Sequence, residues 1–433
     1  MSGTPGWRRA AGNVLALFSG SALSRGLAAV TMIVIARQIG PAAYGQFSAS
    51  IAVAALVSAL FSLGLDGWLL YRGGRQPEEL GTSAASALLL RAALGPLWLV
   101  ILWAAAPVLN QDSFPRVLLL LAGLALWAEG INQITWSTFK ARLQNDLTLA
   151  LMTIAALLFL ALTLALAARQ VQDTNAYMSG RLAAALAATL FSGLLLARRV
   201  HLRLRPGQLR TVLRTTLPFG ASVLLAAIYG RADLAIVANE LGNAAAGEYA
   251  PALNLVSALS LVPAAIFGVM VPFLGRRQGD EPARIRRTAL RLVILTTVAG
   301  AVSGLALAAA ARPLVTLLYG QPFQASSASL ALLGGVLALR FPNMTLAAIL
   351  VAIGWQTRRV AVQAVAAVSN VVVNLAIVHR AGVQGVAIVY VVTELVLFAG
   401  CLALFVTWAR TPRSPSVGGG PALSGAEGMG SAA

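Results

Sequence analysis

Charged side chains are scarce in this sequence. Only 11% of its 433 residues are Asp, Glu, Lys or Arg, against about 25% in soluble domains, whereas 58% are hydrophobic. The single cysteine, Cys401, excludes an internal disulfide and a cysteine-based metal cluster. The two histidines are far apart, and no phosphate-binding loop motif is present, so neither a metal centre nor ATP hydrolysis is expected. These absences argue against a water-soluble enzyme.

Long apolar segments occupy most of the chain, and the mean hydropathy is +0.80. Most of them are long enough to cross a hydrocarbon core of about 30 Å as a helix. They leave too little chain between them for a folded domain outside the membrane. The sequence therefore predicts an all-α polytopic membrane protein with about twelve spans, near residues 14–36, 46–70, 84–106, 117–139, 147–168, 176–197, 216–238, 249–274, 291–311, 328–354, 360–378 and 384–408.

Basic residues predict how these spans are oriented. The chain has 32 Lys and Arg against 14 Asp and Glu, a net charge of +18. If the spans alternate in direction, 22 of the 32 lie on the side of the N-terminus, and five lie on the opposite side. The positive-inside rule then places both termini in the cytoplasm, in a multi-pass protein of the cytoplasmic membrane. The same asymmetry accounts for most of the net charge, so nucleic acid is not expected as a partner.

Two turns repeat one pattern. Ile39–Phe47 and Leu241–Tyr249 both read apolar-Gly-x4-Gly-x-aromatic, at an offset of 202 residues. Glycine suits positions that need a positive φ or a close approach of two backbones. The aromatic residue is expected at the outer membrane interface, where such rings are favoured. Because six spans separate the copies, the two halves share one orientation, which predicts a parallel repeat of two six-helix lobes.

The repeat also predicts how the chain is divided. The connection between the lobes is unusually basic, and the last residues are rich in Gly, Ser, Pro and Ala, which is typical of disorder. The expected parts are a cytoplasmic N-terminus (1–13), an N-lobe (14–197), a basic cytoplasmic linker (198–215), a C-lobe (216–408) and a disordered cytoplasmic tail (409–433).

Nine ionisable residues fall inside the predicted spans. Each costs at least about 2.5–3.5 kcal/mol near the bilayer centre, so each is a candidate for function. Polar residues accompany them at helical spacing: Glu129, Asn132, Gln133 and Trp136 share one face of the fourth span, and Asn370 and Asn374 share a face of the eleventh. The nine are Arg25, Asp66, Arg91, Glu129, Arg181, Arg231, Asp233, Arg340 and Glu394.

Two interpretations of these charges stay open. In the first, Arg25 pairs with Glu129 and Arg340 with Glu394, so that each pair locks two helices together. In the second, the arginines face a central cavity and bind an anionic headgroup, because guanidinium matches phosphate oxygens bidentately. Asp66 and Arg181 lie close enough to span ends to reach the interface by extending their side chains.

Several motifs in order resemble a known family. Ala36–Gly45 and Leu63–Asp66 occur around the first two spans, Leu217–Gly220 and Gly247–Tyr249 around the seventh and eighth, and Ala381–Ala387 before the twelfth. This order is similar to that of Wzx-type polysaccharide-biosynthesis flippases, in the multidrug/oligosaccharidyl-lipid/polysaccharide exporter superfamily, which includes the MATE transporters. The resemblance covers about residues 12–408, nearly the whole chain.

The resemblance implies two six-helix lobes arranged as a V around a cavity. It also implies transport of an undecaprenyl-diphosphate-linked oligosaccharide to the outer leaflet, for O-antigen lipopolysaccharide or exopolysaccharide, without enzymatic chemistry. The lipid bilayer, a polysaccharide polymerase and chain-length proteins are the implied partners. No cofactor or metal is implied, and coupling to a proton or sodium gradient or to the membrane potential stays open.

On this resemblance, the candidate site residues fall into two groups. The headgroup candidates are Arg25, Arg91, Arg231, Arg340, Asn132, Gln133, Asn370 and Asn374. The ion-coupling candidates are Asp66, Glu129, Asp233 and Glu394.

Two other functions remain alternatives. A multidrug or cation antiporter of the same superfamily would share the two-lobe plan, although arginines at mid-membrane disfavour an organic cation. A non-transporting scaffold in a polysaccharide assembly complex would need none of the charges for transport. The sugar repeat, the polymer, the coupling ion and the oligomeric state do not follow from the sequence.

Overall fold

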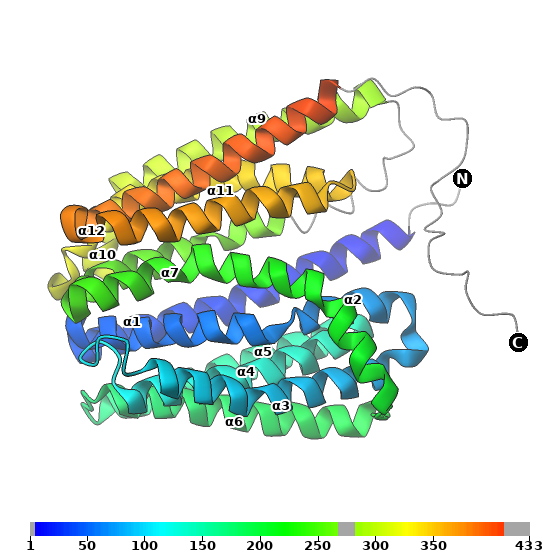
Figure 1. The fold of residues 1–433 in the computed structure, drawn as a ribbon, viewed down its shortest axis with the longest axis horizontal. Helices are drawn as coiled ribbons and strands as arrows, with labels where there is room; N and C mark the ends of the chain where they lie inside the picture. Colours follow the sequence, from blue (N-terminus) through cyan, green and yellow to red (C-terminus); the bar gives the residue numbers. More distant parts are fainter. Residues whose placement is uncertain (1–4, 267–281, 411–433) are drawn as a thin grey trace, which may run out of the picture.

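The computed structural model describes residues 5–266 and 282–410 and is helical throughout these ranges, without a β-strand (Figure 1). Besides the short 3-10 turns Pro77–Glu79 and Gln321–Phe323, the elements are α1 (Pro5–Ser62), α2 (Leu65–Arg75), α3 (Leu80–Ala105), α4 (Arg116–Ala141), α5 (Asn145–Ala168), α6 (Thr174–Arg199), α7 (Pro206–Leu259), α9 (Pro282–Ala309), α10 (Ala311–Leu318), α11 (Ser326–Ala352) and α12 (Gln356–Arg410). The predicted all-α fold is confirmed.

Long helices broken by glycine account for the number of spans. Within the described ranges, nine helices are long and apolar enough to cross a membrane. Three of them contain a glycine with non-helical backbone angles, Gly40 in α1, Gly242 in α7 and Gly382 in α12, each with a positive φ. Each break divides one helix into two antiparallel segments, so the twelve predicted crossings are present. The eighth predicted span, 249–274, is described as far as Ile266.

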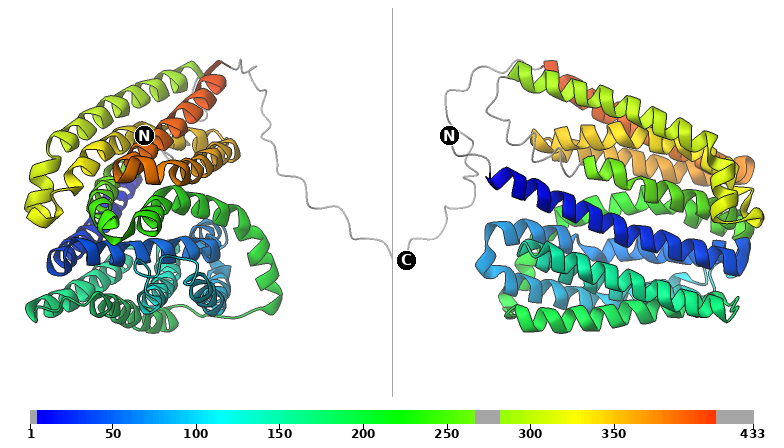
Figure 2. Two further views of the ribbon diagram at one scale, coloured as in Figure 1. Left: turned by 60° about the vertical axis from the view of Figure 1, so that its left-hand side comes forward. Right: turned by 180° about the vertical axis from the view of Figure 1, so that it is seen from behind.

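The helices form two lobes. In Figure 1, α3 to α6 lie in the lower half and α9 to α12 in the upper half, with α1 and α7 side by side between them. Between the lobes, residues 200–205 are not helical, and α7 begins at Pro206, so the second half of the predicted linker is already part of a helix. Figure 2 shows the same two lobes from two other sides. The predicted tail beyond Arg410 lies outside the described residues.

One predicted span is interrupted. The sequence predicted a continuous second span over 46–70, but α1 ends at Ser62 and α2 begins at Leu65. Leu63 and Gly64 both have positive φ values, 50° and 62°. A Cβ on Gly64 would lie 2.6 Å from the carbonyl carbon of Phe219 in α7. The turn therefore lets the two lobes touch through their backbones at this end of the molecule.

The two copies of the repeat meet each other. A Cβ on Gly45 would collide with the carbonyl oxygen of Asn243, and a Cβ on Gly247 would collide with that of Pro41. Gly247 and Asn243 are the positions 202 residues after Gly45 and Pro41. The contact of Gly45 with Asn243 is thus repeated, with the two copies exchanged, by the contact of Gly247 with Pro41. Contacts that are exchanged in this way are typical of a two-fold relation. The parallel repeat is thus visible as a pseudo-two-fold contact between α1 and α7.

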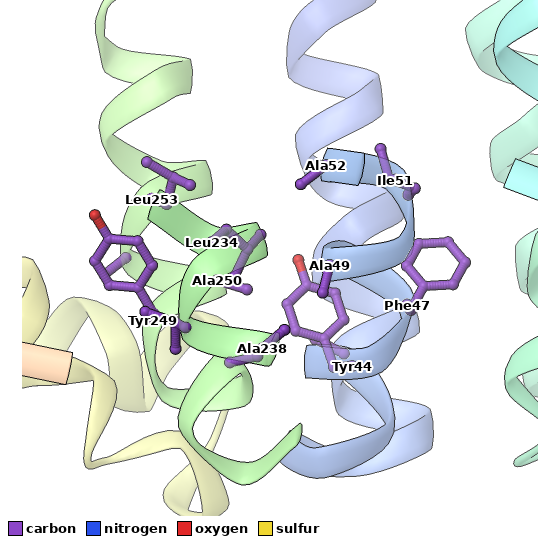
Figure 3. Packing of buried hydrophobic residues seen from close by; sticks show 14 of the residues in the cluster. Tyr44, Phe47, Ala49, Ile51, Ala52, Leu234, Ala238, Tyr249, Ala250 and Leu253 are labelled. Atoms are coloured by element: carbon purple, nitrogen blue, oxygen red, sulfur yellow. The ribbon is translucent and has the colours of Figure 1, made fainter. Parts of the chain in front are cut away.

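The aromatic residues of the repeat are not where the sequence predicted them. Phe47 and Tyr249 were expected at the outer membrane interface, but both are fully buried. In Figure 3 they point away from each other, Phe47 to one side of the α1–α7 contact and Tyr249 to the other. Tyr44 lies between the two helices. The prediction was wrong because the close backbone contact leaves both rings inside the protein, where they fill its core.

The two repeats lie at one end of the molecule, which we call the far end. Hydrogen bonds between the lobes close this end. Arg37 donates from Nε to the carbonyl oxygen of Leu318 at 2.8 Å, so a side chain of one lobe caps the C-terminus of α10 in the other. Asn243 Nδ2 donates to the carbonyl oxygen of Asp112 at 2.9 Å, again between lobes. The far end comprises residues 36–46, 106–116, 239–248 and 310–325.

We predict that Gly247→Ala destabilises the protein although alanine normally favours a helix. The added methyl group has no room against Pro41, and such overpacking costs about 1–3 kcal/mol. Thermal unfolding of the purified protein in detergent should show a lower midpoint. Gly193→Ala is the control, because a Cβ there meets no atom within 4 Å. Equal midpoints for the two variants would contradict the close contact between the repeats.

Candidate functional site

A cavity of about 370 Å³ opens among α1, α4, α5, α6 and α7. One face of α4 lines this cavity with all four of the polar-face residues predicted from the sequence, Glu129, Asn132, Gln133 and Trp136. Asn132 is fixed there, because Ser192 Oγ donates to its Oδ1 at 2.7 Å. The predicted polar face therefore lines a cavity, and through Asn132 it also bonds α4 to α6.

A second cavity of about 250 Å³ lies between α1, α7, α11 and α12. Tyr229, Arg340 and Tyr390 contribute to its walls. Arg25, from α1, lines both cavities, which are therefore neighbours and lie between helices of the two lobes. We call them together the interlobe cavities.

Glu129 is paired, but not with the residue that the sequence suggested. Arg181 donates from Nε and Nη2 to the two oxygens of Glu129 at 2.8 and 3.0 Å, a bidentate ion pair between α6 and α4. The predicted Arg25–Glu129 pair is therefore wrong, and so is the prediction that Arg181 extends to the interface. Arg181 instead reaches into the first cavity, because α4 and α6 are neighbours and bring the two side chains into register.

Arg340 and Glu394 form the other predicted pair, with Nε to Oε1 at 2.9 Å. Arg340 also donates from Nη1 to Ser260 Oγ at 2.7 Å and from Nη2 to the hydroxyl of Tyr390. Asn343 Nδ2 donates to the second carboxylate oxygen of Glu394 at 2.8 Å. The charge of Arg340 is thus balanced, and its side chain is held in one orientation at the cavity wall.

Two arginines of the interlobe cavities keep an unbalanced charge. Arg25, Arg181, Arg231 and Arg340 line these cavities together with one glutamate, Glu129. Arg181 and Arg340 have carboxylate partners, whereas no acidic group of the described residues lies within ion-pair distance of Arg25 or Arg231. Arg25 belongs to α1 and Arg231 to α7, so each lobe contributes one unpaired cation. Together they give the space between the lobes a positive potential.

A different set of predicted residues forms a buried cluster in the C-lobe. Asn374 Nδ2 donates to Asp233 Oδ1 at 2.8 Å, and the hydroxyl of Tyr249 donates to Oδ2 at 3.3 Å. Asn370 Nδ2 donates to Thr393 Oγ1 at 3.1 Å. Among the described residues, no basic side chain forms an ion pair with Asp233, which is 1% exposed. This cluster joins α7 to α12 and lines neither interlobe cavity.

Arg91 and Asp66 lie apart from both sites. Arg91 is buried, donates from Nη2 to Ser58 Oγ at 3.0 Å and lies over the ring of Trp98 at 5.0 Å. Asp66 is in the first turn of α2. Neither residue lines an interlobe cavity. The structure therefore brings together Arg25, Glu129, Asn132, Gln133, Arg231 and Arg340, and leaves these two candidates outside.

Sequence reasoning missed part of the cavity wall. Arg181 was set aside because it lies close to a span end. A signal was present, since Ala184, Ala185 and Ala188 follow it at spacings of three, four and seven residues and all four line the first cavity. Small residues at helical spacing from an arginine mark the side of a helix that faces other helices rather than lipid.

Two helical lobes with cavities between them are also the architecture of transporters that alternate access across a membrane. A family model described as polysaccharide biosynthesis protein matches residues 34–328, more than half of the chain. The chain belongs to the polysaccharide biosynthesis protein family. No curated protein matches it.

Several solved structures have the same fold. The lipid II flippase MurJ in an inward closed conformation superposes with a TM-score of 0.72 at 14% identity, covering 90% of this chain and 87% of that one. An inward-facing multidrug resistance MATE transporter of the MOP superfamily gives 0.70 at 17% identity, covering 90% and 94%. An outward-facing MATE transporter gives 0.62 at 17% identity, covering 92% and 95%. At these identities the likeness concerns the fold.

We predict that Glu394→Ala strongly destabilises the protein. It leaves the guanidinium of Arg340 buried without its carboxylate, and such a loss costs about 3–5 kcal/mol. The double variant Arg340→Met/Glu394→Leu removes both charges and should recover most of the loss in thermal unfolding. As a control, Glu79→Ala breaks the more exposed pair with Arg72 and should cost less than about 1 kcal/mol. A similar loss for Glu79→Ala and Glu394→Ala would contradict the buried pair.

Proposed function

We propose that this protein is a flippase that translocates an undecaprenyl-diphosphate-linked oligosaccharide across the cytoplasmic membrane. It would serve the synthesis of a polysaccharide such as O-antigen or exopolysaccharide and act without covalent chemistry. The observation that supports this most directly is the pair of unbalanced arginines, Arg25 and Arg231, between the lobes. Membership of the polysaccharide biosynthesis protein family and the fold shared with a lipid II flippase agree with it.

The charges of the interlobe cavities suit a diphosphate. Guanidinium groups bind phosphate oxygens through paired hydrogen bonds, and these bonds are strengthened where water is excluded. Arg181 and Arg340 would have to break an ion pair with a carboxylate before they bind the phosphates. Arg25 and Arg231 would not. In this proposal Arg25 and Arg231 hold the diphosphate, and the two paired arginines shape the walls around it.

Polar side chains beside the arginines suit the sugars. Asn132 and Gln133 line the first cavity with Trp136. Amide groups can replace the water that sugar hydroxyls lose on entry. The lipid tail would stay in the bilayer, so the cavity has to accept only the headgroup.

The lobes would move relative to each other by releasing their contacts at one end and forming contacts at the other. In this structure the far end is held shut by Arg37, Asn243 and the touching repeats. Opening the far end while the other end closes would expose the headgroup to the opposite leaflet, as alternating access requires. We propose that the far end is extracytoplasmic and both termini cytoplasmic. We further propose that the lobes comprise residues 14–197 and 216–408, linked through 198–215.

Asp233 is our proposed ion-coupling residue. Its carboxylate is buried, is satisfied by neutral hydrogen-bond donors and has no basic partner in the described residues. A proton or a sodium ion would neutralise the carboxylate. Because burial disfavours a charged carboxylate, either ion would stabilise this site more than an exposed one. Because the cluster joins α7 to α12, loading it would stabilise one packing of the C-lobe. Glu129 and Glu394 are less suitable, since each already has an arginine.

We predict that Arg25→Ala and Arg231→Ala each weaken the binding of a polyprenyl-diphosphate oligosaccharide by roughly 10- to 100-fold, the loss of one charge-assisted contact. Binding to the purified protein can be measured by microscale thermophoresis. Arg380→Ala is the charge-matched control, because Arg380 is exposed and lines neither cavity, and it should bind as wild type does.

The same assay separates the alternatives. Binding of an organic cation without the diphosphate lipid would favour the antiporter and contradict the flippase. If the variants bind the lipid as wild type does, the arginines are not the headgroup site. A scaffold would be favoured if Arg25→Ala leaves polysaccharide export unchanged in cells while the protein stays folded.

We predict that Asp233→Asn abolishes the dependence of transport on its coupling ion. The asparagine keeps the size of the side chain but cannot bind a proton or carry a negative charge. Transport into proteoliposomes should respond to an imposed proton or sodium gradient in wild type and not in the variant. Asp146→Asn, at an exposed position, is the control and should keep the response. A response that survives in Asp233→Asn would exclude Asp233 as the coupling residue.

A further inference from the structure

A third cavity lies away from the interlobe cavities, at the end of the molecule opposite the far end. It has a volume of about 730 Å³ and is formed by the start of α3, the turn between α4 and α5, and the connection that leads from α6 to α7. Its cationic lining residues are Arg142, Arg199, Arg203 and Arg205, and His201 also lines it. One acidic residue, Glu78, shares the lining. We call this cavity the basic groove.

The connection that forms one wall has two different faces. Val200 and Arg205, at its two ends, have extended backbone angles. Successive side chains of an extended segment point in opposite directions. His201, Arg203 and Arg205 line the groove, whereas Leu202 and Leu204 do not and are 38% and 58% exposed. The segment therefore presents alternate basic residues to the groove and leucines to the outside.

Contacts with the N-lobe hold this segment in place. A Cβ on Gly81, in the first turn of α3, would collide with the carbonyl oxygen of His201, so the two backbones touch. Arg142 donates from Nη1 to the carbonyl oxygen of Arg199 at 2.5 Å, which fixes its guanidinium at the groove wall. The groove is thus formed before any ligand binds, which lowers the entropic cost of binding.

We propose that the basic groove binds the phosphate headgroup of a membrane lipid, with Leu202 and Leu204 among its acyl chains. Four arginines against one glutamate favour an anion, and their planar groups favour phosphate. Leucines facing outward next to basic residues are typical of a segment at the boundary of headgroups and acyl chains. A soluble acidic protein would use the arginines but would gain nothing from leucines that belong in lipid.

This site would act on the link between the lobes and does not depend on the proposed transport function. The segment that carries Arg203 and Arg205 continues directly into α7, which touches the N-lobe at Phe219 and at Gly247. A lipid that holds the segment against the N-lobe would therefore restrain the first turns of α7. The basic excess at this end predicts that the lipid comes from the cytoplasmic leaflet.

The test compares two pairs of neighbouring arginines in the full chain. Arg203→Gln/Arg205→Gln removes two charges from the groove. Arg210→Gln/Arg214→Gln removes two exposed charges a few residues further on that do not line it. Binding of phosphatidylglycerol and of phosphatidylcholine to the detergent-solubilised protein is followed by native mass spectrometry. We expect wild type and the second variant to prefer phosphatidylglycerol, and the first variant to lose about 10-fold or more in affinity for it.

Further arms identify the lipid. A polyprenyl diphosphate that binds with the same dependence on Arg203 and Arg205, in place of phosphatidylglycerol, would support a lipid phosphate site and assign it to the carrier lipid. The variant Leu202→Ser/Leu204→Ser should bind either lipid more weakly. It should leave unchanged how strongly inorganic phosphate competes with the lipid. Equal losses for the two arginine pairs, or competition by inorganic phosphate as strong as that by lipid, would overturn the proposal. Unfolding midpoints without lipid verify that all variants are folded.

Discussion

The contact between Gly45 and Gly247 is the constraint on which the arrangement of this protein depends. Neither position has room for a Cβ, because each faces a carbonyl oxygen of the opposite repeat. Two helices can approach this closely in a membrane only through small residues. The contact fixes α1 against α7, and these two helices carry the two arginines that have no acidic partner. Closing the far end and forming a cationic space are thus consequences of one symmetric contact.

The buried charges follow the same physical logic. A charge within the membrane is costly unless it is paired or lines a polar cavity. Arg181 is paired with Glu129, and Arg340 is paired with Glu394, whereas Asp233 is surrounded by neutral donors. Arg25 and Arg231 line a cavity instead and occur on the first helix of each lobe. Two cations that face a cavity without a carboxylate favour a ligand with negative charge.

Periodicity predicted much of this structure. The twelve crossings, the two lobes, the positive φ of Gly40 and Gly242 and the polar face of α4 all followed from local patterns in the sequence. What failed depended on which helices are neighbours. The partner of Glu129 could not be predicted, because several arginines had a suitable depth and only the packing of α4 against α6 selects Arg181. The burial of Phe47 and Tyr249 likewise depends on how the repeats pack together.

Binding of the diphosphate by Arg25 and Arg231 is tested most directly by a structure of the purified protein with a bound polyprenyl-diphosphate oligosaccharide, determined by cryo-electron microscopy. We expect density for the two phosphates between Arg25 and Arg231, with the sugars toward Asn132 and Gln133. Phosphates bound elsewhere, or a lipid seated on the outside of the lobes with the interlobe cavities unchanged, would contradict it.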